Sequence, residues 1–111
     1  MLPKINRLNL KTDFKWVSSG RKIDTKFAGL FLKSGDNLFP RIGIAVSGKV
    51  FKKATERNRA RRLVSKTFES IYANLPKDVN IVALPKLKVL EVKSGEVFLD
   101  LEEALRKAKI I

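Results

Sequence analysis

A long helix with one apolar face constrains this 111-residue chain more than any other feature of its sequence. Apolar side chains recur there at steps of three and four residues, at Ala60, Leu63, Val64, Phe68, Ile71 and Leu75. That spacing places them on one side of an α-helix, which must be buried against other parts of the protein. We therefore predict a single core and one domain over residues 1–111.

The same helix begins in a strongly basic stretch, KKATERNRARRLVSK at residues 52–66, with seven cationic side chains and one glutamate. A helical wheel places five side chains opposite the apolar stripe: Asn58, Arg62, Ser65, Lys66 and Glu69. Arg59 and Arg61 flank that face, while Arg57 falls nearer the apolar side and needs the helix end to reach solvent.

A solvated surface is the simplest explanation of a charged helix face, but three features favour an anionic partner. The cations cluster in the first turns, where the helix dipole disfavours positive charge. Only Glu56 is near enough to offset them. Arginine outnumbers lysine four to one from Arg57 to Lys66, and its planar fork suits phosphates. The helix N-terminus adds free N–H groups at the same place.

Composition supports a polyanion partner and excludes several chemistries. Lys and Arg number 24 against 11 acids, a net charge of +13, and 20 of those bases lie in residues 1–90. The absence of Cys and His removes thiol nucleophiles and imidazole bases. Nucleic acid is favoured over a membrane surface because no segment shows an amphipathic insertion face. With no apolar run of about 20 residues and no signal-peptide core, a cytoplasmic location is expected.

The coarse pattern predicts helices packed on one sheet, an α+β or α/β sandwich. A short helix is expected at residues 13–19 with Thr12 as its cap. Strands are expected at 26–33 and 41–47, paired as a hairpin, and a central apolar strand at 79–85. A small hairpin around residues 93–95 and a last helix from Asp100, with Glu103 in capping-box spacing, close the chain.

Several conspicuous side chains have a structural and a functional interpretation. Phe14 and Phe31 are equally compatible with core packing and with an exposed cleft, whereas Trp16 is expected to be partly exposed and Phe27 structural. The acids near the C-terminus suggest a carboxylate pair for acid–base or metal chemistry, but capping and solvation explain them more simply. These acids are Glu91, Glu96, Asp100, Glu102 and Glu103.

The stretch ERNRARRLVSKTF, preceded by RIGIAVSGKV, resembles the protein subunit of bacterial ribonuclease P. That family combines an Arg-Asn-Arg helix with a preceding strand that reads Arg-Val-Gly-x-x-Val-Ser-Lys-Lys. RLNLKTDFKWVSSGRK, NIVALPK and the final helix extend the resemblance over nearly the whole chain. It implies a sheet of about four strands with three helices in αββαβα order, like domain 2 of ribosomal protein S5, with a left-handed βαβ crossover.

The resemblance also implies a function: a subunit of a ribonucleoprotein that removes the 5′ leader of precursor tRNA. In the family the RNA, with its bound Mg²⁺, performs the hydrolysis, so no catalytic residue and no metal site are expected on this chain. The implied partners are ribonuclease P RNA and precursor tRNA, with no membrane and no small-molecule substrate.

Two sets of site residues follow from matching the family's motifs. The residues implied to bind the catalytic RNA are Arg57, Asn58, Arg59, Arg61, Arg62 and Lys66. Those implied to line a cleft for the precursor-tRNA leader are Phe14, Val17, Phe31, Lys49 and Arg61. Aromatic platforms beside cations bind unpaired nucleotides by stacking and backbone charge, which agrees with such a cleft.

The sequence departs from the family pattern at Gly48, Phe51, Ser65 and Ser18, and residues 87–99 look like a local insertion. Phe51 stands where the family usually has glycine, so it either packs on the sheet edge or offers a new stacking surface. A non-enzymatic RNA-binding protein of the ribosome or its assembly is the alternative function. A protein nuclease acting alone comes third, because no His and no clustered carboxylates are present to activate water.

Overall fold

The computed structural model describes residues 2–111 and has an α+β fold of three helices and a four-stranded mixed sheet. The helices are α1 (Leu10–Ser18), α2 (Ala54–Ile71) and α3 (Ser94–Lys107). The strands are β1 (Arg21–Asp24), β2 (Ala28–Ser34), β3 (Arg41–Ile44) and β4 (Val79–Pro85), in the sheet order β1-β2-β4-β3. Short 3₁₀ helices occupy Lys4–Asn6, Tyr72–Asn74 and Leu87–Glu91. The expected fold class is confirmed.

The predicted hairpin between residues 26–33 and 41–47 is wrong. β2 pairs antiparallel with β1 and with β4, while β3 pairs parallel with β4 through a β3-α2-β4 crossover. β4 takes the centre, as expected, because its side chains, apart from Asn80, are apolar on both faces and nearly all are buried. β1, with the sequence RKID, was missed because it is an edge strand of mostly exposed, charged residues. The order of elements is therefore αβββαβα, one strand more than αββαβα.

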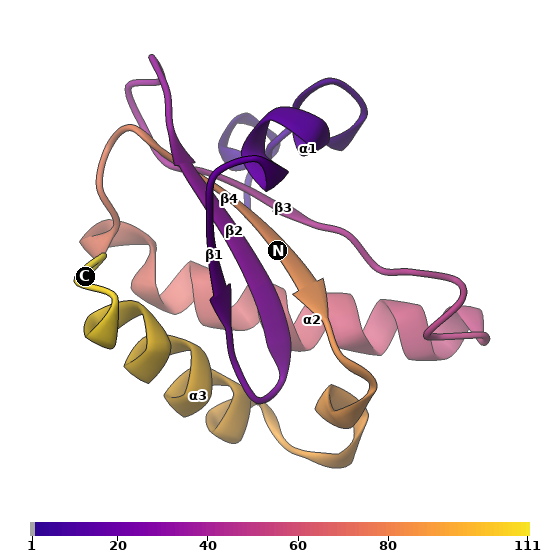
Figure 1. The fold of residues 1–111 in the computed structure, drawn as a ribbon. Helices are drawn as coiled ribbons and strands as arrows, with labels where there is room; N and C mark the ends of the chain where they lie inside the picture. The colour runs from indigo at the N-terminus through magenta and orange to yellow at the C-terminus, as the bar shows by residue number, and fades with distance from the viewer. Residues whose placement is uncertain (1) are drawn as a thin grey trace.

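The sheet separates two groups of helices (Figure 1). On one face, Leu30 and Leu32 of β2 join the main core with α2 and α3. On the other face, Phe31 and Val82 lie in a smaller cluster with Val17 of α1. This division follows from the two-residue period of a strand, which points successive side chains to opposite faces. Phe27 is buried in the main core, as predicted.

Helix α1 begins earlier than the pattern suggested. It spans Leu10–Ser18, and its N-cap is Asn9, whose side chain accepts a hydrogen bond from the Lys11 N–H at 3.1 Å. The predicted cap, Thr12, lies inside the first turn and its hydroxyl donates back to the Asn9 carbonyl. Asn and Thr both occur at helix starts, so sequence alone did not separate them.

Helix α2 buries its apolar stripe as predicted, with Ala60, Val64 and Phe68 fully inaccessible to solvent. Ser65 corrects the helical wheel, because it is buried rather than exposed opposite the stripe. It lies in a hollow beside Leu8 and Ile44, so α2 is covered by the N-terminal segment and β3 as well as by the core. The buried arc is therefore wider than a single stripe.

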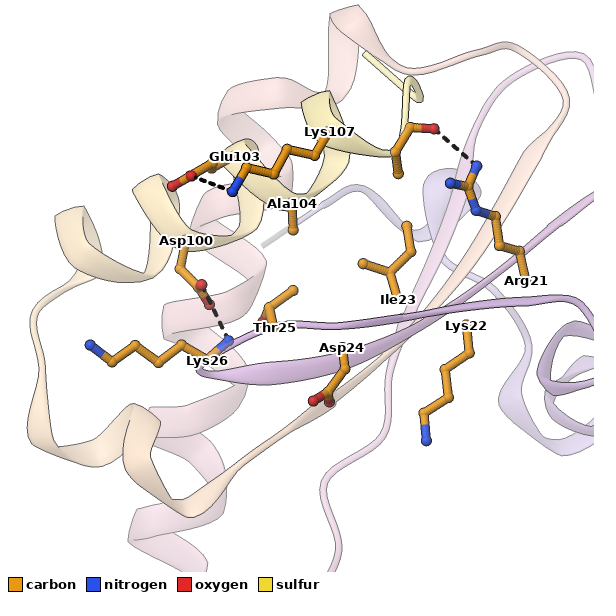
Figure 2. Close-up of a pocket in the computed structure, with 11 residues that line it drawn as sticks. Arg21, Lys22, Ile23, Asp24, Thr25, Lys26, Asp100, Glu103, Ala104 and Lys107 are labelled. Atoms are coloured by element: carbon orange, nitrogen blue, oxygen red, sulfur yellow. Dashed lines mark hydrogen bonds and ion pairs between the residues drawn. The ribbon is translucent and has the colours of Figure 1, made fainter.

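The C-terminal segment differs from the predicted small hairpin around residues 93–95. Residues 87–91 form a 3₁₀ helix, and α3 already begins at Ser94, with Val97, Leu101 and Leu105 buried at helical spacing. Asp100 is thus not a helix cap; its carboxylate accepts hydrogen bonds from the backbone N–H groups of Lys26 and Phe27 at 3.2 and 3.0 Å. Figure 2 shows the Lys26 bond, which ties the β1–β2 turn to α3.

The other C-terminal acids named in the sequence are used locally or stay in solvent. Glu102 and Glu103 pair with Arg106 and Lys107 one turn later, at 3.5 and 2.9 Å. Such exposed pairs add only a few tenths of a kcal/mol each.

Among residues 2–111, no helix is both long and apolar enough to cross a bilayer.

Candidate nucleic-acid interface

The exposed face of α2 carries cations that form no ion pair with the part of the chain that the structure describes. Arg59, Arg62 and Lys66 are exposed, and no described residue forms an ion pair with any of them. Asn58 is exposed beside them, and its side-chain oxygen accepts a hydrogen bond from Arg61 Nη1 at 3.1 Å. The single acid in this part of the helix, Glu56, accepts from the Lys53 backbone N–H at 3.4 Å. The face therefore presents arginine and lysine heads free to bind phosphate.

Arg57 has a different environment from the other arginines of the helix. It is half-buried, and its Nη1 donates to the carbonyls of Phe51 and Lys52 at 2.8 and 3.2 Å. The partial burial of Arg57 agrees with its position near the apolar side of the helical wheel, where only the helix end lets the guanidinium reach solvent. Arg57 fixes the loop that leads from β3 into α2, which sets where the rest of the basic face lies.

Phe51 anchors the same loop through its side chain. It is 0% exposed and lies in the main core. The sequence left two roles open for Phe51, packing on the sheet edge or stacking on a base. The structure supports packing, because a fully buried ring offers no surface for stacking. Its neighbours Lys49 and Val50 remain at the surface.

A groove of about 420 Å³ lies on the sheet face that carries α1, over the half of that face that α1 leaves open. Its lining residues are Lys22, Asp24, Gly29, Phe31, Val50, Leu84, Pro85, Lys86 and Leu87. Lys22 lies opposite Phe31 in the β1–β2 pairing, and its Nζ is 5.8 Å from the centre of the Phe31 ring. Figure 2 shows the side chains of Lys22 and Asp24 on the side of β1 away from α3. The groove thus combines an aromatic and apolar floor with cationic walls.

The one acid in the groove lining is held by a lysine. Lys86 Nζ lies 2.7 Å from the Asp24 carboxylate and also donates to the Thr25 carbonyl at 2.7 Å. The hydrogen bond from Lys86, then its charge, and then the charge of Lys22 keep the pKa of Asp24 below its ordinary value. Asp24 therefore stays ionised and positions Lys86 rather than opposing an incoming anion.

This pairing predicts an acid-sensitive contact. Because the folded pKa of Asp24 is depressed, the pair's contribution to stability is present above the unfolded pKa and is lost as pH falls through the folded pKa. In an NMR titration of the side-chain carboxyl, Lys86→Gln is expected to raise the Asp24 pKa toward 3.8. Lys26→Gln, a nearby exposed lysine on the same turn, serves as the control. An unchanged Asp24 pKa in Lys86→Gln would show that the ion pair is not formed in solution.

The residues predicted to line the leader cleft are only partly brought together. Phe31 lines the groove, and Phe14 is half-buried in the same cluster. Val17 is 0% exposed, so it supports Phe14 and Phe31 from below and presents no surface of its own. Lys49 is exposed on the loop beside Val50, which lines the groove. Arg61 lines a separate hollow of about 210 Å³.

Phe31 is the one predicted cleft residue in the groove lining, and the residues that sequence reasoning missed include Lys22, Leu84 and Lys86. Lys22 belongs to β1, the strand that was not predicted, and Lys86 follows β4 directly. Leu84 could have been assigned to the face of Val82, because the two are separated by one strand period. For Lys22, only the pairing register of β1 with β2, which sets it opposite Phe31, shows that it reaches the face of Phe31.

The fold and the site define a small basic α+β protein in which a cationic helix leads into an aromatic groove, a class suited to unpaired polyanions. The family model described as Ribonuclease P matches residues 2–109. The chain therefore belongs to the ribonuclease P protein family, whose function is that of the protein component in tRNA 5′-end processing.

Individual relatives agree with this assignment. A ribonuclease P protein component from Pseudanabaena is 33% identical over 113 residues, which cover 100% of this chain and 97% of the relative. The RNase P protein structure from Thermotoga maritima superposes with a TM-score of 0.80 at 29% identity, covering 91% of this chain and 96% of that one. An RNase P protein mutant from Staphylococcus aureus gives a TM-score of 0.85 at 20% identity, covering 97% and 92%, and shows the shared fold.

Proposed function

We propose that the chain binds ribonuclease P RNA through the exposed face of α2 and holds the single-stranded 5′ leader of precursor tRNA in the groove over β1, β2 and β4. The observation that carries this proposal is the set of exposed cations at Arg59, Arg62 and Lys66, which no residue of 2–111 pairs with. Like charges on one helix face without an acidic partner in the next turn add nothing to the stability of the folded protein, whereas a polyphosphate partner offsets their mutual repulsion.

The groove supports the second half of the proposal. Phe31 offers a ring for base stacking, and Lys22 and Lys86 lie where a phosphate backbone would follow it. Val50 joins the groove to the loop that Arg57 and Phe51 anchor, so the two binding surfaces are connected through one short segment. A strand leaving an RNA bound on α2 could enter the groove along this loop.

In this proposal the hydrolysis belongs to the RNA and to Mg²⁺ held mainly by the RNA. The chain contributes affinity and positioning, and it contains neither the imidazole nor the thiol with which protein nucleases commonly work. The family assignment favours this role over the ribosomal or assembly-factor alternative that the sequence left open.

The test is cleavage of a precursor tRNA by a bacterial ribonuclease P RNA at low Mg²⁺, with and without the protein. Stimulated cleavage that produces the correct 5′ end is the expected result. A folded protein that binds the RNA tightly but leaves cleavage unchanged would contradict the proposal and favour a structural RNA-binding role.

Phe31→Ala separates leader binding from general RNA binding. Loss of a stacking ring is expected to weaken binding of precursor tRNA by about 1–3 kcal/mol, roughly 5- to 150-fold, and to leave mature tRNA unaffected. Binding of the two tRNAs, measured with the assembled ribonucleoprotein, checks this. Phe98→Ala on α3, another half-buried phenylalanine, is the matched control. An equal loss for both tRNAs would assign Phe31 to the core.

A further inference from the structure

A further hollow, distinct from the one that Arg61 lines, is found on the opposite flank of α1 from the groove, at the end of the sheet where β2 stops and β3 begins. It has a volume of about 290 Å³. Its lining residues are Asp13, Trp16, Gly35, Asp36, Asn37, Arg41 and Asn80. Small-molecule pockets begin at roughly 300 Å³, so the hollow suits one flat ring system rather than a whole nucleotide.

The wall of this hollow is the only tryptophan of the chain, Trp16, which is 40% exposed. Lys33 Nζ lies 5.1 Å from the centre of its ring and is held there by donating to Ser19 Oγ at 2.9 Å. The ring edge rests against Gly35, where an added Cβ would come within 2.9 Å of Trp16 Cη2. Trp16 is therefore a fixed aromatic surface rather than a mobile side chain.

The amides at the base of the hollow are already engaged within the protein. Asn37 Nδ2 donates to the Phe39 carbonyl at 2.7 Å, and its oxygen accepts from Asn80 Nδ2 at 2.8 Å. Asn80 Nδ2 also lies within reach of the Lys33 carbonyl at 3.2 Å. These hydrogen bonds fix the shape of the hollow. Because the amide groups are already engaged, the charged side chains are the groups that can bind a ligand.

The charged side chains of the hollow have unmet hydrogen-bonding capacity. Arg41 stacks on Phe39 at 5.5 Å, but its Nε is buried and has no hydrogen-bond partner among residues 2–111. No described residue donates a hydrogen bond to the carboxylate of Asp13 or Asp36 either. A buried unpaired donor is costly, so the Arg41 guanidinium is the group that indicates an absent ligand. The carboxylates of Asp13 and Asp36 reach solvent and remain available to the same ligand.

Guanine is the base that fits this combination. It presents two adjacent donors, N1–H and the N2 amino group, to a single carboxylate, and its O6 and N7 are the acceptors that arginine prefers. Adenine, cytosine and uracil place an acceptor next to each donor on the same edge, which a carboxylate repels. A phosphate group is disfavoured by the same two carboxylates.

We propose that this hollow binds an unpaired guanine base of RNA, stacked on Trp16, with Asp13 accepting from N1–H and N2–H and Arg41 donating to the O6 and N7 edge. Asp13 is assigned this role because it is half-buried and projects from the rigid helix α1 three residues before Trp16. Asp36 is exposed on the loop and forms the rim. The site is separate from the leader groove and extends the proposed function.

The sole tryptophan makes the test specific to this hollow. Trp16 fluorescence is followed during titration with four RNA pentanucleotides of equal length and charge, UUGUU, UUAUU, UUCUU and UUUUU. UUGUU is expected to quench the fluorescence and to bind with an affinity at least roughly tenfold above that of the other three RNAs. One bidentate contact to a base gives discrimination of this size. Equal quenching by all four RNAs would overturn the proposal.

Asp13→Asn keeps the shape of the side chain and the fluorescent reporter, and it is expected to abolish the preference for UUGUU. Glu96→Gln changes the net charge equally on the exposed surface of α3 and is expected to retain the preference. A preference that survives in Asp13→Asn would overturn the assignment. Cleavage stimulation is measured separately with the unaltered protein, so failure of the guanine preference is distinguishable from failure of the proposed function on which it rests.

A titration with guanosine monophosphate tests whether the hollow binds a guanine within RNA or a free guanine nucleotide. Binding at least tenfold weaker than that of UUGUU is expected, because the pentanucleotide adds phosphate contacts to a chain of net charge +13. Tighter binding of the mononucleotide than of the RNA would overturn the RNA source.

Discussion

Replacing Arg59, Arg62 and Lys66 together by alanine is expected to weaken binding of ribonuclease P RNA by a factor on the order of one thousand. Each head group is exposed and forms no ion pair within residues 2–111, so its charge is available to a phosphate. Hydrogen bonds to charged groups contribute roughly 1.5–3 kcal/mol each, and three losses at the lower end of that range, about 4.5 kcal/mol, give this factor. The fold should survive, since none of the three side chains is buried.

The salt dependence of binding identifies the mechanism. Each phosphate contact releases condensed counterions, so Arg59→Ala and Arg62→Ala are each expected to flatten the plot of log affinity against log salt by about one unit. Filter binding or fluorescence titration of the RNA at several salt concentrations measures both the affinity and the slope.

The control is a second triple variant with the same change in net charge, Lys26→Ala, Lys77→Ala and Lys93→Ala. These lysines are exposed and lie outside α2. A modest loss without a comparable change in slope is expected. If both triple variants lose affinity equally, the RNA responds to the net charge of +13 rather than to the face of α2.

Phe51→Ala has the largest expected effect on stability. The ring is fully buried, and its removal leaves a cavity that costs about 3–5 kcal/mol. In a domain of this size each kcal/mol lowers the melting temperature by roughly 4–8 °C, so a fall of more than about 10 °C is expected in a thermal melt. Val50→Ala, at the next position and 43% exposed, should change the melting temperature little.

Phe51→Ala should also affect the basic face of α2, because the backbone carbonyl of residue 51 accepts the 2.8 Å hydrogen bond from Arg57. At a temperature where Phe51→Ala remains folded, RNA binding is expected to weaken through displacement of the loop before α2. A melting temperature equal to that of Val50→Ala would show that Phe51 is not in the core, and the stacking alternative would return.

The helix that organises the protein could be predicted because its information is local. A period of 3.6 residues and a cluster of arginines are contained within α2 itself, so Ala60, Val64 and Phe68 were assigned correctly from the sequence. The same holds for β4, whose continuous apolar run predicts a central strand. The family motifs lie in these same local stretches, which is why the resemblance was recognisable.

Strand pairing and the site details depended on residues far apart in the chain. Nothing within residues 41–47 indicates that β3 pairs with β4 instead of β2, because the choice depends on α2 crossing between them. The start of α3 at Ser94 was not predicted, because the apolar residues of this segment fit the strands of a small hairpin as well as a helix. Only packing against α2 decides between the two structures.

The sequence by itself therefore determined the family, the basic face of α2 and the class of partner, since charge and helical period are properties of contiguous residues. Only the tertiary structure decided that Lys22 and Lys86 wall the groove, that Val17 is buried beneath it, and that Asp13, Trp16 and Arg41 line one hollow. These placements depend on strand register and on the contact of α1 with the sheet. Both are set by long-range packing that no short segment encodes.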